Sequence, residues 1–142
     1  MQRSILLLVF VACVVNLMAC TAITTKDNQG TVYMAVADLP CSQVIKSVIE
    51  KLEEDKYSFH WKDQSKGLLS IGPIIDDGKA AEGFVKVRQF YQLSFRCTDE
   101  LFTSIANQVV LEGLDKNGKW VAIVDTPVVE DYGMQFLDRL KL

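Results

Sequence analysis

The side chains that could carry out catalysis in this 142-residue chain are one histidine, four cysteines and scattered serines and acids. His60 has no second histidine at the spacing of a metal site, and nothing around it or the cysteines resembles a nucleophile motif. No serine lies in a Gly-x-Ser-x-Gly elbow, and no glycine-rich phosphate loop occurs. Asp76 and Asp77 lack the alternating acidic ligands of a calcium loop. The sequence therefore predicts no catalytic residue, no metal site and no cofactor.

The cysteine with the clearest chemical assignment is Cys20, which follows Leu-Met-Ala at positions 17–19 and a long apolar run. This order resembles the end of a bacterial lipoprotein signal, in which a small residue precedes the cleavage site and the next cysteine is lipidated. Arg3 supplies the short positive region in front of the apolar core. We therefore expect residues 1–19 to be a signal peptide and Cys20 to carry the acyl chains, such as palmitate, that hold the protein on a membrane.

Two other interpretations of the N-terminal segment stay open. The run from Ile5 to Ala22 is long enough to cross a bilayer as an uncleaved helix, and an ordinary secretory signal would release a soluble protein. All three interpretations place the rest of the chain outside the cytoplasm. Thr21 takes the position where an aspartate retains lipoproteins of enteric type at the inner membrane. That resemblance implies a lipid-anchored protein of the outer membrane, with its domain facing the periplasm.

The two remaining cysteines of the mature chain, Cys41 and Cys97, are expected to form a disulfide. Cys13 would be removed with the signal peptide and Cys20 would be lipidated, which leaves one pair in an oxidising compartment. Each lies on the apolar face of its own predicted element, so both are expected to face the core. Two separate buried thiols are the alternative.

The mature chain has the length and apolar content of a single domain with one core. We expect a polar tether over residues 20–30, beginning with the lipidated cysteine, and one domain over residues 31–142. The net charge is −3 and no cluster of lysine or arginine stands out, so the chain lacks the electrostatic signature of a nucleic-acid-binding protein.

The apolar spacing alternates between helical and strand periods. Apolar positions recur at helical spacing from Cys41 to about Lys56, with Asp38 as the expected N-cap. A second helix is expected from Thr126-Pro127, in which Gly133 either weakens the helix or permits close approach to the sheet. Strands are expected over residues 31–37, 57–61, 67–71, 84–97, 105–114 and 120–125, with a connector over 98–104, and with Gly72-Pro73 ending the strand that starts at residue 67.

The longest predicted strand alternates strictly, with Val87, Gln89, Tyr91 and Leu93 on one face. An Asn-Gly pair between the last two apolar runs predicts a hairpin. The fold class is therefore α+β, with a single antiparallel sheet, two helices packed on one face, and a βαβββα-like, helix-grip order.

Three features of this pattern together resemble a known family. They are the stretch from Ala37 through the helix to Tyr57, the turn with Asp63 and Gly67 before a strand, and the apolar face of the closing helix, made of Tyr132, Phe136, Leu137 and Leu140. They are similar to the helix-grip domains of the lipoprotein C subunit of the β-barrel assembly machinery. The resemblance covers most of the mature chain and implies a non-catalytic assembly accessory at the outer membrane, with no catalytic residues to carry over.

Three functions of different classes follow as hypotheses. The favoured one is a non-catalytic interaction module that docks an envelope protein partner through a strand edge or through the sheet face opposite the helices. The alternative is a carrier of an apolar ligand in a groove between helix and sheet. An enzyme is the third. No nucleic-acid partner is expected.

Overall fold

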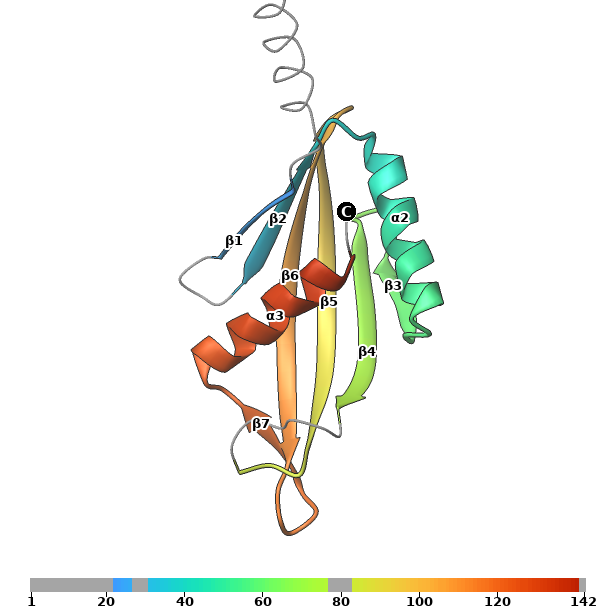
Figure 1. Ribbon diagram of the computed structural model, residues 1–142. Coiled ribbons are helices and arrows are strands. Elements are labelled where there is room, and N and C mark those ends of the chain that lie inside the picture. Colours follow the sequence, from blue (N-terminus) through green and yellow to red (C-terminus); the bar gives the residue numbers. More distant parts are fainter. Residues whose placement is uncertain (1–21, 27–30, 77–82, 141–142) are drawn as a thin grey trace, which may run out of the picture.

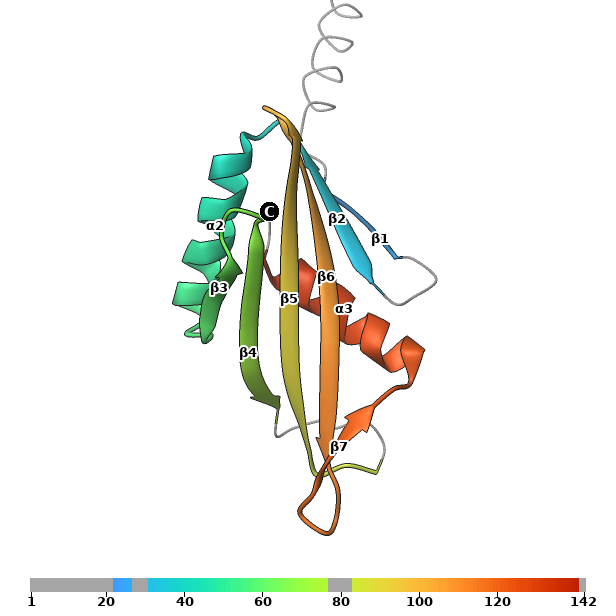
Figure 2. The same ribbon diagram turned by 180° about the vertical axis from the view of Figure 1, so that it is seen from behind.

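The computed structural model describes residues 22–26, 31–76 and 83–140. The predicted signal peptide, Cys20 and Asp77 lie outside this part of the chain. Within it, seven strands form one antiparallel sheet in the order β1-β2-β6-β5-β4-β3, with β7 also paired to β6. Both helices lie on the same face of this sheet (Figure 1), and the view from behind shows the strands uncovered (Figure 2). The predicted α+β class, with one antiparallel sheet and two helices, is confirmed.

The elements follow one another as two strands, a helix, five strands and a helix. Their bounds are β1 (Ala22–Lys26), β2 (Val32–Ala37), α2 (Cys41–Glu54), β3 (Phe59–Asp63), β4 (Leu68–Asp76), β5 (Lys86–Asp99), β6 (Phe102–Leu114), β7 (Trp120–Ile123) and α3 (Thr126–Leu140).

The hairpin of β5 and β6 forms the centre of the sheet, and its two strands pair along almost their whole length. The predicted alternation holds in β5, where Val87, Tyr91 and Leu93 are buried on the side of the helices. Residues between them, such as Arg88 and Gln92, are half-buried on the opposite side. The period of two therefore divides the sheet into a core face and a face without helices.

Helix α2 packs on the sheet through one apolar stripe, as its spacing predicts. Val44, Val48 and Leu52 of this stripe are fully buried in the main core. The predicted N-cap is wrong, because the residue before the helix is Pro40 and no side chain caps the helix. Asp38 instead has a positive φ of 65° and donates its backbone N–H to the carbonyl of Leu101, 2.9 Å away, which turns the chain from β2 towards α2.

Helix α3 crosses the sheet at a glycine. A Cβ atom added at Gly133 would lie 3.0 Å from methyl carbons of both Val32 and Val109. The amide Nδ2 of Asn107 donates to the carbonyl of Gly133 at 3.1 Å. Gly133 thus has both predicted roles. It weakens the helix intrinsically, and its lack of a side chain allows the backbone of α3 to approach β6.

The C-terminal half of α3 closes the core. Phe136 stacks on Tyr91 with ring centroids 3.9 Å apart, and Leu137 and Leu140 are buried beside it. The predicted hairpin between β6 and β7 is also present. There Asp115 Oδ1 accepts hydrogen bonds from the backbone N–H groups of Asn117 and Lys119 at 2.8 and 2.9 Å.

Two strands are longer than the sequence predicts. Gly72-Pro73 does not end β4, because the register shifts there in a bulge and pairing resumes at Ile74, opposite Gln89. The predicted connector over residues 98–104 is wrong as well. The connector is only a tight turn at Glu100 and Leu101, because β5 extends to Asp99 and β6 begins at Phe102. Within β6, Thr103 continues the alternation of the apolar residues and is itself buried.

One further strand lies where a tether was expected. The expectation is wrong for Ala22–Lys26, which pairs with β2 as the edge strand β1. Its β-branched residues Ile23, Thr24 and Thr25 are typical of strands, and the pairing satisfies the outer backbone groups of β2. The ordered sheet therefore begins two residues after Cys20.

The close approach of α3 to the sheet predicts that Gly133 tolerates no β-branched side chain. We expect Gly133→Val to lower the free energy of unfolding by about 1–3 kcal/mol, because two methyl-bearing neighbours on β2 and β6 would have to move. Met134→Val is the matched control, since Met134 is the next residue and is 37% exposed. Urea titrations of both variants test this, and a Gly133→Val protein that loses no stability would contradict the close approach, because helix propensity alone favours valine over glycine.

Candidate functional site

The face of the sheet opposite the helices, called the open face below, is covered by neither of the described helices (Figure 2). It is built by the alternate residues of β3, β4, β5 and β6 that point away from the core. Because the strands are antiparallel and in register, residues from separate parts of the sequence lie side by side on it.

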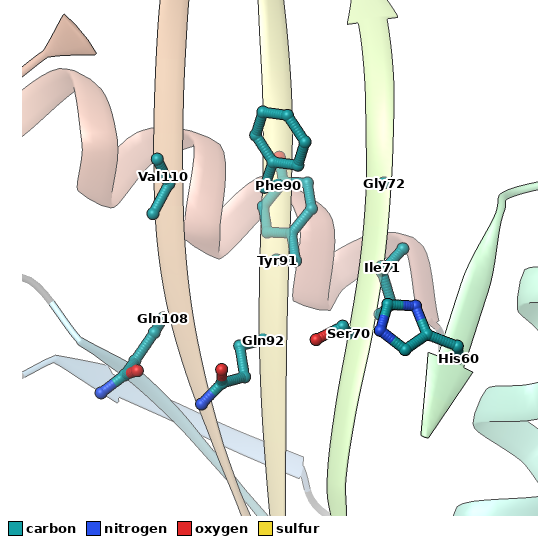
Figure 3. Close-up of a pocket in the computed structure, with 9 residues that line it drawn as sticks. All are labelled: His60, Ser70, Ile71, Gly72, Phe90, Tyr91, Gln92, Gln108 and Val110. Carbon is teal, nitrogen blue, oxygen red and sulfur yellow. The ribbon is translucent and has the colours of Figure 1, made fainter. Parts of the chain in front are cut away.

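Four polar residues form a single row across the open face. His60 of β3 pairs with Ser70 of β4, Ser70 pairs with Gln92 of β5, and Gln92 pairs with Gln108 of β6. Figure 3 shows their side chains one beside the next on the four strands. We call these four residues the polar row.

A hollow of about 360 Å³ lies between the polar row and the next row of the sheet. In that next row Phe90 of β5 is paired with Val110 of β6 (Figure 3). Gly72 also lines the hollow, and only glycine suits this position, because a Cβ there would lie 2.6 Å from the carbonyl oxygen of Gln89 and the φ of Gly72 is 118°. Among the residues that the structure describes, the lining consists of His60, Ser70, Ile71, Gly72, Phe90, Tyr91, Gln92, Gln108 and Val110.

Two cationic side chains contact residues that line the hollow. Lys62 Nζ donates to Gln92 Oε1 at 3.3 Å. Arg88 Nε donates to Glu112 Oε2 at 2.6 Å, and the Arg88 guanidinium lies 4.3 Å from the ring centroid of Trp120. The Arg88 guanidinium is therefore both ion-paired with Glu112 and stacked on the Trp120 ring. The part of the lining that the structure describes includes no carboxylate, lysine or arginine.

Tyr91, which also lines the hollow, belongs to the main core. Its Oη donates to Gln89 Oε1 at 2.7 Å, and burial raises the pKa of this phenol well above its ordinary value. Burial also raises the pKa of Tyr132, with the negative charge of Asp76 adding to the effect. Both phenols are consequently neutral at neutral pH.

The predicted cysteine pair lies away from the open face. The structure joins Cys41 at the start of α2 to Cys97 near the end of β5, with their Cα atoms 5.8 Å apart. Both cysteines lie on the expected faces of their elements, but neither is enclosed in the core, since Cys97 is exposed and Cys41 half-buried. Cys97 has the core-facing phase of β5, but it lies beyond Phe95, the last buried residue of that strand.

The other residues considered for chemistry are not brought together. His60 lies in the polar row, whereas Asp76 lines a different depression with Asp131, Tyr132 and Arg139. Within residues 22–26, 31–76 and 83–140, no three histidine, cysteine or acidic side chains are placed to share a metal ion. The helices in the same ranges include none that is both long and apolar enough to span a membrane.

Comparison with the models of known protein families and with curated protein sequences finds no match for this chain. The polar row itself was missed by the sequence analysis. Its members lie on four strands and are neighbours only through the sheet register, which periodicity alone does not give. The outward phase of Gln92 on β5 was the one available signal.

The cysteine geometry predicts that the mature protein contains no free thiol at Cys41 or Cys97. We expect alkylation of the denatured, unreduced protein to modify neither residue. Replacing both by serine should lower the free energy of unfolding by about 4 kcal/mol in the chain-entropy treatment, because the bond closes a loop with a sequence separation of 56. Two alkylated thiols before reduction would contradict the pairing.

Proposed function

We propose that this protein is a non-catalytic lipoprotein of the bacterial outer membrane that docks an envelope protein as an assembly accessory, with its domain facing the periplasm. The observation that carries the proposal is the open face, which no described helix covers although it contains large apolar groups. Val110 and Ile75 are 58% and 53% exposed there, and Phe90 and Trp120 are half-buried. Exposed apolar and aromatic groups gathered on one face are typical of protein contact sites.

The packing of α2 favours docking over the alternative, a carrier of an apolar ligand. A carrier would hold its ligand between this helix and the sheet. The helix instead buries Val44, Val48 and Leu52 completely, in one cluster with Leu69 and Leu93 of the sheet. Side chains of the protein itself thus fill the space that a ligand would need.

The proposed membrane anchor is the lipidated Cys20. Its support is the order of residue types in the first twenty positions, with a small residue before the cysteine and an apolar run before that. Since β1 begins at Ala22, an anchor at Cys20 would hold the domain close to the bilayer. Several acyl chains on one cysteine bind a membrane far more stably than a single chain does.

The anchor assignment predicts the behaviour of Cys20→Ser in the native host. The variant should accumulate as unprocessed precursor or move to the soluble fraction, because neither cleavage nor lipidation can proceed. Mass spectrometry of the processed protein and fractionation of the envelope test this. If the variant has the same mature mass as the native protein and still fractionates with the outer membrane, Cys20 is not the anchor.

The docking assignment predicts that a charge on the open face abolishes partner binding without unfolding the domain. We expect Val110→Glu to reduce co-purification from crosslinked, detergent-solubilised envelopes at least tenfold, because an unpaired carboxylate would be buried in the contact. Val124→Glu is the matched control, since Val124 is 84% exposed in the loop before α3. A folded Val110→Glu protein that retains its full set of partners would contradict docking through this face.

A further inference from the structure

We infer that the polar row and the adjacent Phe90 form a binding site for a neutral saccharide. This site combines the neutral polar groups of the row with Phe90 and Val110, which also belong to the apolar groups of the open face, and the inference does not depend on the protein partner proposed above. It rests on the composition of the row, on the aromatic ring next to it, and on the absence of charged side chains from the described lining of the hollow.

The row offers the hydrogen-bonding groups that sugar hydroxyls require. Each glutamine amide has two donor hydrogens and one acceptor oxygen, a serine hydroxyl both donates and accepts, and an imidazole presents two ring nitrogens. A sugar hydroxyl is likewise both donor and acceptor, so it can bond to two such groups at once. Because Lys62 donates to Gln92 Oε1, the amide of Gln92 is oriented with its donors available to a ligand.

The neighbouring row supplies the apolar half of such a site. Phe90 and Val110 line the hollow directly beside Gln92 and Gln108 (Figure 3). The face of a pyranose ring carries C–H groups that pack against an aromatic ring, while its hydroxyls point outward to polar neighbours. Pairing one apolar surface with a line of neutral polar groups therefore fits a sugar ring better than it fits a purely apolar ligand.

Charge and size narrow the class of ligand further. The guanidinium of Arg88 is held by Glu112 and Trp120, and Lys62 contacts the row through the neutral amide of Gln92. The described residues that line the hollow include no cation that would select a phosphate or a carboxylate. Adjacent strands lie about 4.8 Å apart, and the row across four strands is therefore about 14 Å long. A short oligosaccharide lying across the strands could contact the whole row, with one ring in the hollow of about 360 Å³.

Titration of the folded mature domain with neutral trisaccharides tests the inference. Maltotriose, cellotriose and triacetylchitotriose are the probes, and the side-chain amide resonances of Gln92 and Gln108 are the readout. We expect at least one probe at millimolar concentration to shift both amides, and the Gln92→Ala/Gln108→Ala variant to weaken its binding at least tenfold. Gln64→Ala is the matched control, since Gln64 is exposed in the turn between β3 and β4, outside the row.

Three results would overturn the assignment. One is that none of the probes shifts the two amides. Another is that the shifts persist unchanged in the double variant, which would place the sugar elsewhere. The third is that an acidic oligosaccharide or an extended peptide shifts these amides while the neutral probes do not. Because the readout is binding of purified sugar to the isolated domain, it is independent of whether Val110→Glu removes a protein partner.

Discussion

The pairing of β5 with β6 is the constraint on which the rest of the structure depends. Its register places Gln92 beside Gln108 and Phe90 beside Val110 on one side, while Leu93 and Asn107 face the helices on the other. A slip of one residue would exchange the two faces of a strand. The hairpin therefore determines at once which side chains form the core and which remain available for binding.

The two helices use the core face differently, and together they leave the open face free. Helix α2 contributes a conventional apolar stripe, whereas α3 approaches β6 so closely that a Cβ at position 133 would lie 3.0 Å from methyl carbons of Val32 and Val109. The Phe136 ring then stacks on Tyr91, whose hydroxyl donates to the buried Gln89. Because both helices pack on one face of the sheet, a binding partner would have to contact the other face or an edge.

Periodicity was sufficient to predict the fold class, both helices and most strands, because burial imposes a period of two or 3.6 on the sequence. The errors have local causes. Asp38 takes a positive φ in place of a cap, a bulge carries β4 past Gly72, and β1 forms by pairing with an edge that periodicity does not reveal. The polar row could not be predicted at all, since it joins four strands that only the register aligns. A sequence motif consists of residues close together along the chain, whereas the four residues of the polar row are far apart in the sequence.

The central claim is that binding takes place on the open face and not on the helical side. Site-specific photo-crosslinking in intact cells tests it most directly, with a photoreactive amino acid placed at Val110 on the open face or at Gln43, an exposed position of α2. The account predicts a specific crosslinked envelope protein from Val110 and none from Gln43. Crosslinks from Gln43 without any from Val110 would contradict it.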